Sequence, residues 1–219
     1  MHIVFPLYHG VTQLDFTGPV QILSRIPGAT IHLVAGNAEA IQTDAGFAVL
    51  PTVTYADCPA ADVICIPGGP GTAAACQDED LLTFLETQVQ SARWITSVCT
   101  GMFLLGKLGL LVDRKATSHW GYTHLISECG ARHSPGRYVV DGNIVTGGGV
   151  TAGIDFALHL TTLIADEETA HTIQLALEYD PAPPFHLGTP ERASPAVLAK
   201  LQPRYAAAAD EIRAVLTTE

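Results

Sequence analysis

Basic residues are scarce in this 219-residue sequence, which has 11 Lys and Arg against 22 Asp and Glu and a formal net charge of −11. An acidic chain is repelled by phosphate backbones and by anionic membrane surfaces, so neither nucleic acid nor a membrane is expected as a partner. The first six residues lack the basic start and the long apolar run of a secretion signal. A cytoplasmic location is therefore expected.

The cysteines are few, odd in number and form no Cys-X-X-Cys pair, which indicates free thiols in a cytoplasmic chain. They are Cys58, Cys65, Cys76, Cys99 and Cys129. The nine histidines form no His-Glu-X-X-His motif and no cluster with the spacing of metal ligands. Neither a metal nor another cofactor is expected, so any reactive group is expected among the thiols.

Internal repeats and low-complexity segments are absent, and no linker divides the chain before about Tyr179. We predict a single domain over 1–219, in which about 180–219 form a proline-rich strap and a C-terminal helix. Short β-rich runs alternate with helical patterns, which predicts an α/β domain of flavodoxin-like type: an open, mostly parallel sheet with helices on both faces. The predicted strands are His2–Leu7, Thr30–Ala35, Asp62–Pro67, Trp94–Val98 and the two halves of Tyr138–Thr146. The predicted helices are Thr17–Ile26, one after Asp78, Thr100–Leu108, Gly121–Cys129, Thr151–Ala165, Glu167–Glu178 and Pro195–Leu216.

Two helix starts are predicted from their capping residues. Thr17 precedes Gly18-Pro19, a pair typical of a first helical turn, and is expected to cap the helix that ends near Ile26. Asp78 is expected to cap the next helix. The apolar stripe of that helix is predicted to consist of Leu82, Leu85 and Val89.

Two segments do not fit the alternation of strands and helices. Gln42–Thr54 contains the turn sequence Asp-Ala-Gly and is typical of a β-hairpin insertion. Tyr179–Arg192 contains four prolines, which exclude a continuous helix. It is either a plain connector, which we favour, or a strap that walls a pocket or a partner subunit.

The sequence around Cys99, WITSVCTGMFLLG, has the strand, turn and helix of a nucleophile elbow. Such a turn places the side chain at the carboxyl end of a sheet, where open α/β folds bind ligands. The helix that follows offers free N–H groups and a positive dipole end, both of which stabilise a thiolate. Gly101 allows another backbone to pack close to the turn. The alternative for Cys99 is a small buried apolar residue.

Two glycine-rich loops also join strands to helices. In DVICIPGGPG, Gly68 and Gly69 leave backbone N–H groups free to face a developing charge, so the N–H groups of Gly69 and Thr100 are predicted to form an oxyanion hole. The alternative is a tight turn. For TGGGVTAGIDFALHL, residues 146–160, close packing of helix on sheet is favoured over a hinge or an approach to the site.

Two further side chains are candidates for an acid or a base. Asp15 follows the first strand, on the same edge of a parallel sheet as Cys99, although an Asp before a helix is more often a cap or a surface residue. His119 follows another short run and is either a base for the cysteine or a structural hydrogen-bonding group.

With these segments together, the chain resembles the ThiJ/PfpI superfamily, which has the class I glutamine amidotransferase-like fold. The resemblance covers roughly residues 1–180 and rests on IPGGPG, SVCTG, TSHW and TGGGVTAGID in this order. Within the superfamily the chain most resembles the isonitrile hydratases. The features that favour this branch are LDFTGP, which contains Asp15, SVCTG with Thr100 after the cysteine, and EYDPAPPF at residues 178–185.

The resemblance implies hydration of isonitriles to N-substituted formamides through a covalent thioimidate on Cys99. It places the acidic partner at Asp15, which supplies a proton to the substrate and later activates water. Protease-like members have His directly after the cysteine, and Thr100 stands there instead, so peptidase activity is not expected.

The substrate is expected to lie against Thr100, Gly68, Gly69 and His119, with His119 a neighbour and not the base. A small-molecule isonitrile is the expected partner, and the resemblance implies a homodimer without cofactors.

Two other functions fit the same thiol. Some transcription activators carry a similar amidase-like domain, but about 180–219 contain one helix-like segment, too little for a pair of DNA-binding helical units. A stand-alone regulatory or sensor domain is therefore the first alternative. A glyoxalase or deglycase type of stress enzyme is the second, and substrate tests distinguish it.

Overall fold

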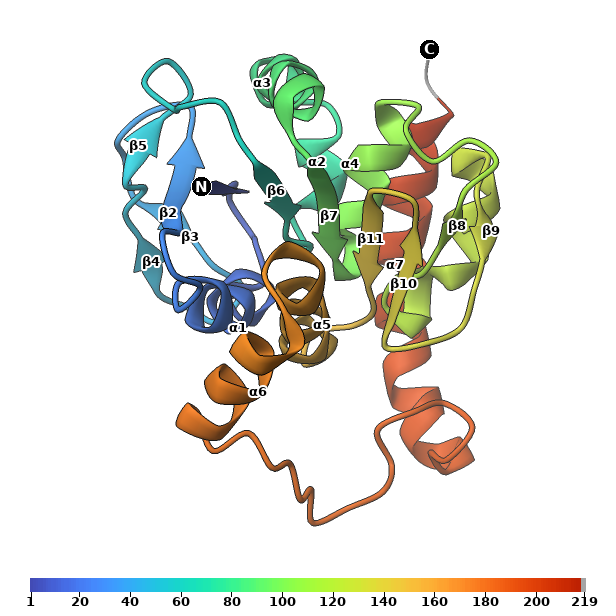
Figure 1. Cartoon of the computed structure of the whole chain (residues 1–219). Helices are drawn as coiled ribbons and strands as arrows, with labels where there is room; N and C mark the ends of the chain where they lie inside the picture. The colour runs from blue at the N-terminus through green and yellow to red at the C-terminus, as the bar shows by residue number, and fades with distance from the viewer. Residues whose placement is uncertain (218–219) are drawn as a thin grey trace.

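A seven-stranded sheet forms the centre of the protein in the computed structural model, which describes residues 1–217 (Figure 1). The predicted single domain extends to residue 219, and its last two residues lie outside the described part. The strands lie in the order β10-β11-β7-β6-β1-β2-β5, and all neighbours are parallel except β10 and β11. Their bounds are β1 His2–Pro6, β2 Thr30–Ala35, β5 Val53–Thr54, β6 Val63–Ile66, β7 Trp94–Val98, β10 Tyr138–Asp141 and β11 Ile144–Gly147.

The central strands are apolar because the sheet is covered on both faces. Every residue of β6 is buried, and Ile64 pairs with Val4 of β1 on one side and with Ile95 of β7 on the other. β6 and β7 correspond to runs of almost exclusively apolar or small residues, which are typical of buried strands. Each predicted strand of the sheet is confirmed.

Helices cover both faces of the sheet, as predicted. On one face α1 packs against α5, with α6 beyond it, and on the other α2, α4 and α7 pack together (Figure 1). The crossover from β1 to β2 runs in the opposite direction to the one from β6 to β7, so right-handed connections place α1 and α3 on opposite faces. The helices are α1 Gln13–Leu23, α2 Thr72–Ala75, α3 Glu79–Ser91, α4 Met102–Lys107, α5 Ala152–Ile164, α6 Glu167–Ala176 and α7 Pro195–Leu216.

The predicted start of the first helix is wrong. Helix α1 begins at Gln13, with Pro19 inside it, and the Thr17 hydroxyl donates to the Gln13 side chain instead of capping the helix. Pro19 removes one helical hydrogen bond. The helix tolerates this loss because it buries an apolar face that includes Phe16 and Ile22.

The capping role of Asp78 is confirmed, because its side chain accepts a hydrogen bond from the N–H of Leu81 at 3.0 Å. The apolar face of α3 is shifted from the predicted stripe. Leu85 is buried as expected, whereas Leu82 and Val89 are half-buried. The other buried side chains of the helix are Leu81, Phe84 and Gln88.

Two other predictions hold only in part. The hairpin is confined to β3 (Ile41–Gln42) and β4 (Ala48–Val49), because β5 pairs with β2 and becomes the edge of the main sheet. The helix predicted over Gly121–Cys129 is a 3₁₀ segment, η2 (Trp120–Cys129). Its first turn contains Gly, Tyr, Thr and His, all weaker helix formers than Ala or Leu.

The proline-rich strap runs from α6 to α7 without helix, as its prolines predict (Figure 1). Its residues 188–191 line a cavity of about 560 Å³, whose other walls include His119 and Val150. The strap therefore walls a pocket, which is the alternative that the sequence did not favour. The small strands β8 (Lys115–Ala116) and β9 (Arg132–His133) form a separate pair beside η2.

The topology brings three loops to one edge of the sheet. Strands β1, β6 and β7 are adjacent and parallel, so the segments that follow them meet at their carboxyl ends. The strand order reverses between β1 and β6: the crossover after β1 leads to one edge of the sheet, and the crossover after β6 leads to the other. Open α/β sheets bind ligands at such a position. Among residues 1–217, no helix has both the length and the apolar character that crossing a membrane requires.

Candidate active site

Cys99 occupies the sharp turn that follows β7. Its backbone φ is 58°, which places a non-glycine residue in the left-handed region, where the conformation is strained. The 3₁₀ turn Cys99–Gly101 and α4 follow directly. The predicted elbow is therefore present, and the surrounding structure holds it in an unfavourable conformation.

The elbow packs tightly against the loop that follows β6. A Cβ atom on Gly101 would lie 2.2 Å from the carbonyl oxygen of Ile66, and one on Gly68 would lie 2.4 Å from the backbone nitrogen of Thr100. Neither position has room for a side chain. The carbonyl of Cys99 also accepts a hydrogen bond from the Ser118 hydroxyl at 2.8 Å, which fixes the turn from its other side.

Asp15 is completely buried beside this turn, in the first turn of α1. Its Oδ2 accepts a hydrogen bond from the N–H of Gly68 at 3.0 Å, whereas its Oδ1 is buried without a hydrogen bond among the described residues. The helix-capping position belongs to Thr12, so the capping alternative for Asp15 is wrong. A buried carboxyl with one unpartnered oxygen beside a thiol suits proton transfer.

Burial raises the pKa of Asp15 to about 7, although the hydrogen bond from the Gly68 N–H and the neighbouring Cys99 thiol oppose the rise. Burial also raises the pKa of Cys99 well above that of a free thiol, and the negative charge of Asp15 adds to this rise. The N–H groups of Thr100 and Val150 and the Thr100 hydroxyl lower the pKa of Cys99. The two acids interact directly, so they titrate as a coupled pair that retains a proton at neutral pH.

The predicted oxyanion hole is not formed by Gly69. Its N–H donates to the Thr100 hydroxyl oxygen at 2.9 Å, and the N–H of Gly68 is used by Asp15. The Thr100 hydroxyl also shares a hydrogen bond of 2.7 Å with Thr72. Neither glycine therefore has an N–H free for a substrate, because short side-chain acceptors reach both.

Val150, which sequence reasoning missed, lines the site beside Cys99, and its N–H lowers the pKa of the thiol. Val150 has a φ of 23° and follows the glycine run after β11. A Cβ on Gly147 of β11 would lie 3.5 Å from Cβ of Phe156 in α5, so the favoured interpretation of this run as close packing of helix on sheet is confirmed. The same run also approaches Cys99, through Val150. The only sequence feature that could have indicated this is a β-branched residue directly after three glycines.

A cavity of about 230 Å³ opens above Cys99, which is itself only 6% exposed. Gly69, Thr100, His119, Tyr122 and Val150 line it. The C-terminal helix α7 adds Arg204, Tyr205, Ala208 and Glu211, which no feature of the sequence indicated.

His119 serves as a structural hydrogen-bonding group and a wall of this cavity. Its Nδ1 accepts a hydrogen bond from the N–H of Gly121 at 3.2 Å. Burial lowers the pKa of His119 to about 4, so the ring is uncharged at neutral pH. Within the described residues, no three His, Cys, Asp or Glu side chains lie close enough to hold a metal ion.

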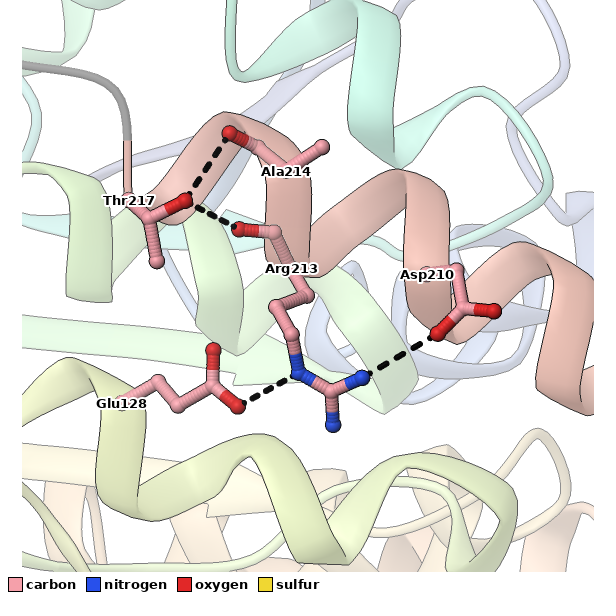
Figure 2. Close-up of polar contacts among 5 residues, drawn as sticks. All are labelled: Glu128, Asp210, Arg213, Ala214 and Thr217. Atoms are coloured by element: carbon pink, nitrogen blue, oxygen red, sulfur yellow. Dashed lines mark hydrogen bonds and ion pairs between the residues drawn. The ribbon is translucent and has the colours of Figure 1, made fainter.

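Polar contacts fix the helix α7 that forms this wall (Figure 2). Arg213 Nε donates to Glu128 of η2 at 2.8 Å, and its Nη1 donates to Asp210 at 3.1 Å. Lys107 of α4 donates to the carbonyl of Val215 at 3.1 Å. The C-terminal half of α7 is thus held by two neighbouring elements.

Comparison with known proteins places these features in a family. Residues 1–163 match the DJ-1/PfpI family. The isonitrile hydratase of Pseudomonas putida is 45% identical over 206 residues, which covers 94% of this chain and 90% of that one. A ThiJ/PfpI family protein from Pseudomonas syringae has a solved structure with a TM-score of 0.95 and 37% identity, covering 99% of this chain and 90% of its own.

A more distant relative belongs to another functional class. The HTH-type transcriptional regulator GbdR of Pseudomonas aeruginosa is 27% identical over 65% of this chain, which corresponds to 40% of the regulator. The resemblance to ThiJ/PfpI proteins and to isonitrile hydratase is confirmed by the first three comparisons, as is the fold class.

The raised pKa of Asp15 predicts how stability depends on pH. Between about pH 4 and pH 7 the folded protein binds more protons than the unfolded chain, so the free energy of unfolding falls as the pH rises. This contribution is complete below about pH 4 and is lost as the pH passes about 7. Asp15→Asn cannot ionise, so its free energy of unfolding should lack this fall of about 4 kcal/mol.

Urea unfolding at several pH values between 4.5 and 7.5 measures the difference. Asp141→Asn is the control, because hydrogen bonds lower the pKa of Asp141 and its titration lies below this range. If the free energies of unfolding of wild type and Asp15→Asn differed by the same amount at every pH from 4.5 to 7.5, Asp15 would be ionised in both the folded and the unfolded state over this range.

Proposed function

This chain belongs to the DJ-1/PfpI family, and from this membership we propose that it is an isonitrile hydratase, which adds water to R–N≡C and releases an N-substituted formamide. The observation that carries the proposal is Cys99, which lines a small cavity, with the buried carboxyl of Asp15 beside it. The thiol is a soft nucleophile for the terminal carbon of an isonitrile, and the carboxyl is a proton donor whose pKa of about 7 suits neutral conditions.

In the first step the sulfur of Cys99 attacks the terminal carbon of the isonitrile. The thiol proton is transferred through Asp15 to that carbon, which gives the thioimidate R–N=CH–S–Cys99. Asp15 regains its original protonation state. The N–H groups of Thr100 and Val150 lower the pKa of the Cys99 thiol, so they stabilise negative charge on the sulfur while the bond forms.

In the second step water adds to the thioimidate carbon. Asp15 accepts a proton from this water and passes it to the nitrogen, giving R–NH–CH(OH)–S–Cys99; when the carbonyl forms, the hydroxyl proton goes to the departing sulfur. The carbon–sulfur bond then breaks, the carbonyl forms, and the thiol of Cys99 is restored with release of R–NH–CHO. No redox partner or cofactor is needed, because the sum of the two steps is the addition of one water.

A homodimer and a location in the cytoplasm are the remaining parts of the proposal. Large apolar side chains are exposed on α6 and the strap, where Leu175 is 83% and Phe185 74% exposed, and such surfaces often bind another chain. The molecular mass in solution tests the homodimer. The cytoplasmic location stays a prediction from the sequence.

Replacement of Cys99 by alanine should abolish turnover. Formamide formation from cyclohexyl isonitrile, measured for wild type and Cys99→Ala side by side, should be lost in the variant because no covalent intermediate can form. Cys58→Ala removes a half-buried thiol outside the cavity and is the matched control. Appreciable hydration by Cys99→Ala would contradict the covalent mechanism.

Inactivity of the wild type towards several isonitriles would contradict the proposed reaction itself. The choice would then return to carbonyl substrates of the glyoxalase type or to ligand sensing.

Replacement of Asp15 by asparagine should lower kcat by about 10²-fold or more, because Asn keeps the shape of Asp but cannot transfer a proton. The measurement is the hydration rate at saturating isonitrile between pH 5 and 9. A rate close to that of wild type would leave Asp15 with a purely structural role through its bond from Gly68.

A further inference from the structure

A second hollow lies directly behind one wall of the catalytic cavity. The catalytic cavity above Cys99 has a volume of about 230 Å³. The second hollow, of about 440 Å³, lies between η2 and α7 and is lined by Trp120, His124 and Gln202 among others. Tyr205 is the aromatic side chain of α7 that lines both.

The ring of Tyr205 is held in this position by an aromatic cluster. Its centroid lies 5.0 Å from that of His119, 4.9 Å from Trp120 and 5.7 Å from Tyr122, and the last two contacts are edge-to-face. Gly121 provides the space, because a Cβ atom there would lie 2.9 Å from Cγ of Tyr205. The contacts with residues 119–122 hold the ring against this segment.

The helix that carries Tyr205 is fixed as well. Ala209 and Ile212, which follow Tyr205 on α7, are buried against the body of the protein. The ion pair between Arg213 and Glu128 links α7 to η2, the segment that supplies Trp120 and Tyr122 (Figure 2). The tyrosine and its aromatic partners are therefore held together by contacts outside the cluster.

We propose that Tyr205 determines which isonitriles this protein accepts, by separating the catalytic cavity from the second hollow and so limiting the R group to compact alkyl or single-ring groups. The inference rests on the proposed hydration reaction. A cavity of roughly 150 Å³ binds benzene, so about 230 Å³ is enough for the reacting N≡C group with one six-membered ring. We expect a fused two-ring group on the same nitrogen to meet the Tyr205 ring, because this ring lines both the catalytic cavity and the second hollow.

The test compares cyclohexyl isonitrile with 2-naphthyl isonitrile. In Tyr205→Ala the two hollows join, so the ratio of kcat/KM for the naphthyl substrate to that for the cyclohexyl substrate should rise at least about tenfold, mainly through a lower KM for the naphthyl compound. Tyr205→Phe retains the ring and should retain the wild-type ratio. Gln202→Ala enlarges only the second hollow and should also leave the ratio unchanged.

A second readout does not depend on isonitrile hydration. Iodoacetamide and its N-(2-naphthyl) derivative both alkylate a thiol: a carbon–sulfur bond forms, and iodide and the thiol proton are released. Peptide mass mapping gives the two rates at Cys99. The naphthyl to unsubstituted rate ratio should rise at least about tenfold in Tyr205→Ala and stay at the wild-type value in Tyr205→Phe.

The two readouts separate the two proposals. A wild type that hydrates no isonitrile overturns the proposed function, while the alkylation ratios still test the role of Tyr205. Unchanged ratios in a folded Tyr205→Ala, or the same rise in Gln202→Ala, would overturn the role of Tyr205. If Tyr205→Ala does not fold, Tyr205→Leu keeps an apolar side chain in the cluster and should shift both ratios in the same direction.

Discussion

The close approach of the loop after β6 to the elbow after β7 is the constraint on which the site depends. This approach is possible only because Gly68 and Gly101 carry no side chain. Once the backbones are this close, the N–H of Gly68 reaches Asp15 and the N–H of Gly69 reaches Thr100. One loop thus holds the acid of α1 and the elbow of β7 in a fixed relation, although these residues lie far apart in the sequence.

The burial of Asp15 and Cys99 favours the binding of a neutral substrate but disfavours the ionised, reactive form of the thiol. It removes water from the place where a neutral substrate must bind, but it raises the pKa of both Cys99 and Asp15. The thiolate is therefore not the resting form, and it has to be generated when it is used. The N–H groups of Thr100 and Val150 at the sulfur, and a carboxyl beside it that can accept a proton, are the groups that make this possible.

The sequence predicts structural features that are set by residues close together along the chain. It does not predict contacts between segments that lie far apart along the chain. The elbow at Cys99 follows from an apolar run and a Thr-Gly turn, and the strands from the same kind of local pattern. The position of Asp15 after the first strand makes it a candidate acid, but only the family resemblance favours it over a helix cap, because the pattern around Pro19 predicts the helix start too late. The predicted use of the Gly69 N–H failed since a nearby hydroxyl reaches it, which only the folded geometry determines.

The buried pair and the wall that α7 adds to the cavity come from different parts of the chain. The family match ends at residue 163, so Cys99, Asp15 and Val150 all lie within it, whereas Tyr205 and the rest of α7 lie beyond it. A relative that shares only the first part can therefore share the elbow without sharing the wall. Under the proposed function, the buried pair sets what can react, and α7, which adds Arg204, Tyr205, Ala208 and Glu211 to the lining of the cavity, limits what can enter.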